Sequence, residues 1–333
     1  MTKSPLRGRR VLVTGADGFI GSHLTERLVN EGAAVRAFCL YNSQGSLGWL
    51  DRVPAEIRQG LDLRLGDIRD SRFVEQAAED IEIIFHLAAL IAIPYSYQAP
   101  ESFVETNVRG TMNVLEAARR NRCTRVVHTS TSEVYGTPRE IPIRESHPLQ
   151  GQSPYSASKI AADKLCEAYF CSFGLPVVTL RPFNTFGPRQ STRAVIPTIL
   201  VQLLAGKTRV ELGRVDTRRD VTFVADTVDG FVRAATAEGV EGDVIQLGTG
   251  RSESVYTFFQ ISCRILGVKA EIVQSQERFR PDKSEVMVLQ SDPSRAREKL
   301  GWQATTSLDD GLARTTEWLK TSLNLYDAGR YHV

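Results

Sequence analysis

The sequence of 333 residues predicts an α/β fold, in which a doubly wound parallel sheet is joined to a smaller C-terminal domain. Short apolar runs of strand length alternate with helical patterns as far as residue 181. Glycines separate the first strand from the first helix, at the carboxyl end of the strand where such sheets bind ligands. After Arg181 the alternation weakens, and proline and glycine become frequent.

The first strand, Arg10–Thr14, is an apolar run that ends at glycines. The helix after it, residues 19–31, places Ile20, Leu24 and Leu28 on one face. The same alternation predicts further strands at residues 34–40, 61–65, 83–87, 125–129 and 177–181, and further helices at residues 73–78, 102–121 and 156–173. Strands that alternate with helices form a parallel sheet with helices on both faces.

The part after Arg181 is expected to divide between the two domains. Residues 220–237 and 243–247 are expected to return to the sheet. The larger domain then comprises residues 1–180 with 220–249, and the smaller domain comprises residues 181–219 with 250–333.

The composition argues against several classes of partner. A net charge of +2 gives no global attraction to nucleic acid or to an anionic membrane. No apolar run reaches the 18 residues typical of a membrane span. The five cysteines form no Cys-x-x-Cys pair, so we expect free thiols in a reducing cytoplasm and no metal site.

Gly15, Gly18 and Gly21 lie at three-residue intervals where the first strand meets the first helix. Glycine lets the backbone turn tightly and approach a pyrophosphate, which the N-terminus of the helix attracts. The spacing differs from that of ordinary dehydrogenases. The strand–helix context nevertheless predicts that the larger domain binds a dinucleotide.

The second strand does not decide which dinucleotide binds. An acidic residue near Cys39 would contact the ribose of NAD, and an arginine would accommodate the 2′-phosphate of NADP. Residues 39–43, Cys-Leu-Tyr-Asn-Ser, contain neither. Asp67, after the third strand, is placed for the adenine end, and a turn or helix cap is its alternative role. We expect NAD, with NADP as the alternative.

Tyr155 and Lys159 are four residues apart in a helical segment and therefore share one face. Thr131 follows the fifth strand and is expected to reach the same pocket. A tyrosine that removes a hydroxyl proton must have its pKa lowered from ~10 to near neutrality, which amounts to about 4 kcal/mol. A lysine ammonium and the positive charge of a nicotinamide both favour the phenolate. The pattern predicts Tyr155 as a base.

Several segments together resemble the extended short-chain dehydrogenase/reductase family, and they cover nearly the whole chain. These are Thr14–Gly21, His86–Ala89, Thr106–Thr111, Ser130–Gly136 and Tyr155–Lys159, with Arg181–Asn184 and Arg219–Asp220 resembling the substrate-domain motifs. The resemblance implies a Rossmann fold, bound NAD(P), a nucleotide-diphosphate sugar as substrate and a homodimer paired through the helices at 102–121 and 156–173. It also implies that Asn184, Arg219 and Arg280 hold the diphosphate, for which the arginine fork is suited.

The resemblance also implies the residues of the site. The expected catalytic residues are Thr131, Ser132, Glu133, Tyr155 and Lys159. The expected cofactor contacts are Gly15, Asp17, Gly18, Phe19, Ile20, Gly21, Asn42, Asp67, Ile68, Leu87, Ala88, Ala89, Asn107, Thr129, Tyr155, Lys159 and Pro182. The expected substrate contacts are Pro94, Ser96, Thr131, Ser132, Glu133, Asn184, Val195, Arg219 and Arg280.

Glu133 separates the reactions that this family performs. All can begin with oxidation at C4 of the sugar. A 4,6-dehydratase then needs a base for the C5 proton and an acid for the 6-hydroxyl, whereas a 4-epimerase needs neither. Familiar dTDP-glucose 4,6-dehydratases carry Thr-Asp-Glu where this chain has Thr131-Ser132-Glu133. GDP-mannose 4,6-dehydratases and UDP-glucuronate decarboxylases resemble this chain in having Ser-Glu.

The segment Ala89–Ser96 offers no positive charge for a substrate carboxylate, which argues against a decarboxylase. Across this segment and residues 151–193, the chain is most similar to GlcNAc-nucleotide 4,6-dehydratases of the legionaminic-acid type. We therefore expect a nucleotide-sugar 4,6-dehydratase that acts on a GlcNAc-type substrate. A 4-epimerase is the second reading and a decarboxylase the third. A dinucleotide-binding sensor or scaffold is disfavoured, because the Tyr–Lys pair and Thr131 are all present.

Overall fold

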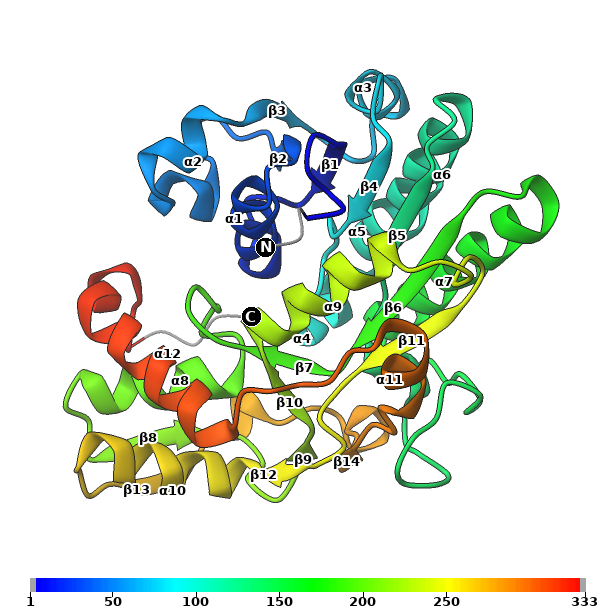
Figure 1. Cartoon of the computed structure of the whole chain (residues 1–333). Coiled ribbons are helices and arrows are strands. Elements are labelled where there is room, and N and C mark those ends of the chain that lie inside the picture. The colour runs from blue at the N-terminus through cyan, green and yellow to red at the C-terminus, as the bar shows by residue number, and fades with distance from the viewer. Residues whose placement is uncertain (1–3, 330–333) are drawn as a thin grey trace.

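The computed structural model describes residues 4–329. Within them, seven parallel strands form one sheet in the order β11-β6-β5-β4-β1-β2-β3 (Figure 1). The strands are β1 (Arg10–Thr14), β2 (Ala34–Leu40), β3 (Asp62–Gly66), β4 (Ile83–His86), β5 (Arg125–Thr129), β6 (Val177–Pro182) and β11 (Val244–Leu247). The strand order reverses between β1 and β4, which is where doubly wound sheets bind their ligands. The predicted fold class is confirmed.

Helices cover both faces of this sheet. They are α1 (Phe19–Asn30), α3 (Ser71–Ala77), α6 (Gly110–Arg120), α7 (Pro154–Phe173) and α9 (Val224–Thr236). Neighbouring residues of β1 lie in different apolar clusters, with Val11 and Val13 on the side of α1 and α9 and Leu12 on the side of α3, α6 and α7. Both faces of the sheet are therefore buried, as is usual for a parallel sheet.

The helix predicted over residues 102–121 is not a single regular α-helix. The structure has α5 (Pro100–Phe103), a π-helical stretch η2 (Val104–Arg109) and then α6. The short helices α2 (Ala55–Gln59) and α4 (Ile93–Gln98) were not predicted. Val104, Met112 and Phe173 are 51%, 40% and 56% exposed on this side of the molecule. Pairing of these helices in a homodimer stays a prediction.

The C-terminal part is built from short strands and helices, most of which lie below the large sheet in Figure 1. The paired strands are β7 (Asn184–Phe186) with β10 (Val221–Phe223), β9 (Arg218–Arg219) with β12 (Glu253–Ser254) and β14 (Val288–Leu289), and β8 (Arg209–Leu212) with β13 (Glu271–Gln274). The helices are α8 (Val195–Leu204), α10 (Val255–Leu266), α11 (Ser294–Leu300) and α12 (Leu308–Ser322). The expected return of residues 220–237 to the large sheet is correct for α9, which packs against β5 and β6, but wrong for β10, which pairs with β7 instead.

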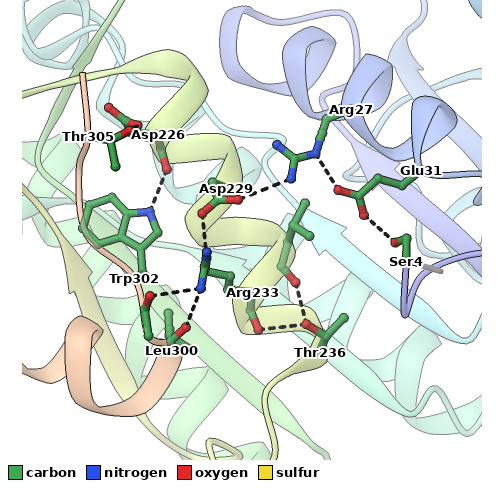
Figure 2. A network of polar contacts seen from close by, with 12 residues as sticks. Ser4, Arg27, Glu31, Asp226, Asp229, Arg233, Thr236, Leu300, Trp302 and Thr305 are labelled. Atoms are coloured by element: carbon green, nitrogen blue, oxygen red, sulfur yellow. Dashed lines mark hydrogen bonds and ion pairs between the residues drawn. The ribbon is translucent and has the colours of Figure 1, made fainter. Parts of the chain in front are cut away.

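Polar contacts fasten α9 between α1 and the C-terminal part (Figure 2). Arg27 of α1 pairs with Asp229 of α9 at 3.3 Å. On the other side, Arg233 donates to the carbonyls of Leu300 and Gly301 at 3.2 and 3.0 Å. Next to it, the buried Trp302 donates its indole N–H to the carbonyl of Asp226 at 2.8 Å. The helix α9 therefore joins the sheet domain to the C-terminal part.

All five cysteines lie within the described residues and are free thiols. No helix formed by residues 4–329 is long and apolar enough to cross a lipid bilayer.

Candidate active site

A cleft of about 1370 Å³ opens between the carboxyl ends of the large sheet and the C-terminal part. One end is lined by the glycine loop and Asp67, the middle by Tyr155, and the other end by Arg219 and Arg280. The cleft therefore joins the regions in which the sequence places the cofactor, the chemistry and the substrate.

The glycine loop leaves the N-terminus of α1 open toward this cleft. Gly15 has a φ of +70°, and a Cβ at Gly21 would lie 2.0 Å from the carbonyl oxygen of Gly15. Side chains are therefore excluded at both positions. Gly18 caps α1 with no side-chain hydrogen bond from the described residues, and the first turn carries no acidic residue. Free N–H groups at a helix N-terminus attract phosphate, so this loop fits the pyrophosphate of a dinucleotide.

Two carboxylates, Asp17 and Asp67, line the cleft together with the glycine loop. Asp67 is held by Arg69 through contacts of 2.6–3.0 Å, and these contacts lower the pKa of Asp67. Asp17 lies at the carboxyl end of β2, where its Oδ2 is 3.4 Å from the backbone N–H of Leu40. Burial raises the pKa of Asp17. The acidic residue that the sequence lacks at the end of β2 is therefore brought there by the glycine loop.

Most of the predicted cofactor contacts line the cleft: Gly15, Asp17, Gly18, Phe19, Ile20, Gly21, Asp67, Ile68, Leu87, Ala88, Ala89, Thr129, Tyr155, Lys159 and Pro182. Asn42 and Asn107 are not among the lining residues. The Asn42 side chain instead folds residues 40–46, donating to the carbonyl of Ser46 at 2.8 Å. Asn107 is buried, and its amide group bonds both backbone groups of Leu90 at 2.8 and 2.9 Å.

Helix α7 carries Tyr155 and Lys159. Its start is fixed by a capping box, in which Ser153 and Ser156 satisfy each other's backbone N–H groups, and by Pro154 in the first turn. Tyr155 is 7% exposed, and Thr131 is near enough to influence the pKa of its phenol. The structure thus brings Thr131, Tyr155 and Lys159 to one part of the cleft.

In the protein without cofactor or substrate, the pKa of Tyr155 is raised above its usual value. Burial is the largest cause, and the charges of Glu133 and Asp163 act in the same direction. The nearby hydroxyl of Thr131 lowers it. Lys159 is not among the groups that shift this pKa, contrary to the expectation from the sequence, and its Nζ donates to the carbonyl of Thr129 at 2.6 Å.

Glu133 lies in η3 (Ser132–Tyr135), the turn that follows Thr131. The hydroxyl of Thr131 accepts the backbone N–H of Glu133 at 3.2 Å, and this bond fixes the start of the turn. The carboxylate of Glu133 is 13% exposed and lies 3.9 Å from Arg280. Ser132 lines the cleft and is otherwise buried. Thr131, Ser132 and Glu133 therefore line the same cleft as Tyr155.

The substrate end of the cleft pairs arginines with a carboxylate that the sequence did not single out. Glu285 is 3.3 Å from Arg219 and 3.8 Å from Arg280. Burial lowers the pKa of Arg219. Asn184 and Val195 also line this end. The sequence has a basic cluster at Arg278-Phe279-Arg280. This cluster is the signal that could have indicated that the segment lines this end of the cleft.

The apolar wall predicted at residues 89–96 is part of the cleft. Leu90, Ile91, Ala92 and Pro94 line it. Ser96 does not, because its buried hydroxyl donates to the carbonyl of Ile93 at 2.7 Å. The wall presents no charged side chain to the cleft.

Comparisons with known proteins agree with this arrangement. The chain matches the family described as GDP-mannose 4,6 dehydratase over residues 12–315. It is 35% identical to the UDP-glucose 4-epimerase of Mycolicibacterium smegmatis, over 93% of this chain and 98% of the relative. It is 30% identical to a dTDP-glucose 4,6-dehydratase of Xanthomonas campestris pv. campestris, over 93% of each protein.

A similar solved structure is DesIV, the dTDP-glucose 4,6-dehydratase from Streptomyces venezuelae, with NAD and TYD bound. The two folds superpose with a TM-score of 0.84 at 29% identity, over 96% of this chain and 99% of that chain. These relatives are named for UDP-glucose or dTDP-glucose, so they lend no support to the narrower resemblance to legionaminic-type enzymes. The chain belongs to the NAD-dependent epimerase/dehydratase family of extended short-chain dehydrogenases/reductases and is a nucleotide-sugar epimerase or 4,6-dehydratase.

Proposed function

We propose that this enzyme is a nucleotide-sugar 4,6-dehydratase that acts on a GlcNAc-type substrate. One observation carries the proposal: the carboxylate of Glu133 lies in the cleft, on the turn that follows Thr131, and its charge acts on Tyr155. A 4,6-dehydratase needs a second acid–base group beside the tyrosine, and a simple 4-epimerase has no use for one.

Bound NAD would supply the oxidising power, taking a hydride from C4 of the sugar and returning one to C6. In the proposed reaction Tyr155 removes the proton of the 4-hydroxyl, and Thr131 favours the phenolate by lowering the pKa of Tyr155. Because burial raises the pKa of Tyr155, the positive charge of the nicotinamide has to provide much of the opposing shift.

The 4-keto group makes the C5 hydrogen acidic. We propose that Glu133 takes this proton and passes it to the departing 6-hydroxyl, while Ser132 orients the carboxylate. The dTDP-glucose dehydratases carry an aspartate at the position of Ser132. In this chain Glu133 would take over the role of that aspartate as the acid. A single carboxylate can serve both steps, because it becomes an acid by accepting the first proton.

The walls of the cleft support the proposed class of substrate. Arg219, Arg280 and Asn184 line the cleft, and the fork geometry of the two arginines suits a diphosphate. The apolar wall at residues 89–96 suits a neutral C6 group or an N-acetyl group. It offers no cation for a C6 carboxylate, so a decarboxylase is disfavoured.

A nucleotide-sugar 4-epimerase is the second candidate. It is favoured by the 35% identity to the UDP-glucose 4-epimerase of Mycolicibacterium smegmatis. It would use Thr131 and Tyr155 in the same way, and it would leave Glu133 without a chemical role.

The test is Glu133→Gln. Glutamine keeps the shape and the hydrogen bonds of the side chain but cannot accept the C5 proton. Water loss should fall by roughly 10²–10⁴-fold, the usual effect of removing a positioned base. Oxidation at C4 should continue, so reduced cofactor should accumulate and be visible as near-ultraviolet absorbance. Exchange of the C5 hydrogen with solvent deuterium should stop.

Glu167→Gln is the matched control, because Glu167 is 58% exposed on α7 and pairs only with Lys164 among the described residues. It should leave every readout unchanged. If C5 exchange in Glu133→Gln proceeds at the rate of the unmodified enzyme, Glu133 is not the dehydratase base. Interconversion of C4 epimers that is unaffected by the substitution would favour the epimerase.

A further inference from the structure

A buried cluster of charged residues lies behind the catalytic groups and has no part in the chemistry proposed above. At its centre is Asp163 of α7, which is 4% exposed. Its Oδ2 accepts hydrogen bonds from the hydroxyl of Ser130 at 2.7 Å and from Nε and Nη2 of Arg181 at 3.1 and 2.9 Å. Charged groups are seldom buried this completely unless they are paired.

These contacts join the segments that carry the catalytic residues. Ser130 directly precedes Thr131 in the chain. Arg181 also donates to the hydroxyl of Tyr135 at 3.1 Å, and Tyr135 ends the turn η3 that contains Glu133. Lys159 lies one helical turn before Asp163 and therefore on the same face of α7. Asp163 thus connects the loop after β5 to the helix that carries Tyr155.

The charges around Asp163 do not balance. Arg181 from β6 and Lys159 from α7 are cations. His128 of β5 lies 3.3 Å from Asp163, but burial lowers its pKa to about 4, so it is neutral near pH 7. His86 of β4 stacks near His128, and its pKa is also lowered by burial.

Two further titratable neighbours, Cys166 and Tyr135, are uncharged near neutral pH, and the carboxylates of Glu145 and Glu133 act on Tyr135 and Tyr155. Burial raises the pKa of the Cys166 thiol and raises that of Tyr135 to about 12. Two cations therefore face one carboxylate. Burial lowers the pKa of Lys159, and the charge of Asp163 is the largest influence that raises it.

We propose that Asp163 is a positioning residue for the reaction, which acts through Lys159, one helical turn away on the same buried face of α7, as the counter-charge that keeps this lysine protonated. The proposal rests on the proposed function, in which Tyr155 is the base, and on the sequence-based prediction that Lys159 is catalytic with it. It does not depend on whether the enzyme is a dehydratase or an epimerase, because both use this pair.

The direction of the effect follows from the charges. Without Asp163, Lys159 and Arg181 would be two uncompensated cations in a site that excludes water. Desolvation then drives Lys159 to release its proton at lower pH. Removal of the negative charge also lowers the pKa of Tyr155, since Asp163 raises it. Both limbs of a pH–rate profile should therefore move to lower pH, whereas structural damage alone would reduce the rate equally at every pH.

The direct test is the titration of Lys159 in the NAD-loaded enzyme with Asp163→Asn. The chain has eight lysines, so ¹³C-lysine labelling gives few signals, and the one lost in Lys159→Met identifies the residue. The titration midpoint of Lys159 should fall by at least about one pH unit in Asp163→Asn. With UDP-GlcNAc as the assay substrate, kcat should fall about tenfold or more at the alkaline end, with KM little changed.

Two further variants keep the test decisive. Asp226→Asn is the matched control, because Asp226 is a buried aspartate that bonds Thr305 and Thr306 far from this cluster. It should lower thermal stability without moving the Lys159 midpoint. Arg181→Gln removes the competing cation and should move the midpoint to higher pH, which tests the proposal even if Asp163→Asn fails to fold.

An unchanged Lys159 midpoint in Asp163→Asn, or a fall in Arg181→Gln, overturns the proposal. Since the titration requires no sugar substrate, its result is independent of the proposed dehydratase activity. Failure of the dehydratase assignment would appear in the Glu133→Gln experiment and leave this titration intact.

Discussion

The two ends of the cleft hold their polar groups in different ways. On the catalytic side the charged groups have short hydrogen bonds to uncharged partners, as with Lys159 on the Thr129 carbonyl at 2.6 Å and Asp163 on Ser130 at 2.7 Å. Within residues 4–329, Oδ1 of Asp163 and the ring nitrogens of His128 are buried without a hydrogen-bond partner. On the substrate side the charged groups contact one another over longer distances. Glu285 is 3.3 Å from Arg219 and 3.8 Å from Arg280. The Nη1 of Arg280 has no hydrogen-bond partner among residues 4–329.

This difference fits two different tasks, chemistry at one end of the cleft and substrate binding at the other. We expect the catalytic side to be arranged before the substrate binds, which would remove reorganisation from the chemical step. The arginines of the substrate side are held near their working positions by carboxylates that bind them incompletely. A diphosphate offers shorter, charge-assisted hydrogen bonds to the same guanidinium groups. Substitutions on the catalytic side should therefore reduce kcat, and those on the substrate side should weaken binding.

The largest effect is expected for Tyr155→Phe. Loss of the phenol hydroxyl removes the base, so kcat should fall by roughly 10²–10⁴-fold. Phenylalanine has nearly the same volume, so thermal stability should change little. Steady-state kinetics and a thermal melt of the same preparation check both statements. Near-normal turnover would show that another group removes the 4-hydroxyl proton. It would also contradict the expectation that substitutions on the catalytic side reduce kcat.

A smaller effect is expected for Arg219→Met. Hydrogen bonds between charged partners contribute about 1.5–3 kcal/mol, so UDP should bind roughly 10–100-fold more weakly. Calorimetric titration with UDP measures this loss directly. Arg209→Met is the control, because Arg209 is 70% exposed on β8. A fall in kcat with unchanged UDP affinity would place Arg219 with the catalytic groups.

The sheet domain could be predicted closely from the sequence. Its buried parallel strands appear as continuous apolar runs, and the predicted bounds of β1, β2 and β5 agree with the structure. The cofactor and catalytic signals are also local. The glycines lie within seven residues of one another, and Tyr155 and Lys159 share one helical turn.

The substrate side could not be predicted in the same way, because its pairs form between residues far apart in the chain. Arg219 lies in the two-residue strand β9, which is defined only by its partners β12 and β14. Glu285 pairs with it from 66 residues away. Asp163 was missed although its helical spacing from Lys159 was visible, because its bond to Arg181 depends on the neighbouring strand β6. Ser96 and Asn107 were expected at the cleft, but hydrogen bonds hold both elsewhere.

The most direct test of the central claim is the mass of the product. The unmodified enzyme, loaded with NAD, would be incubated in turn with UDP-, GDP-, dTDP- and CDP-linked sugars, including UDP-GlcNAc. A 4,6-dehydratase releases a product that is lighter than its substrate by one water, and the account predicts this result with the GlcNAc-type substrate. A product of unchanged mass with inverted C4, identified by NMR, would contradict the account and make the enzyme a 4-epimerase.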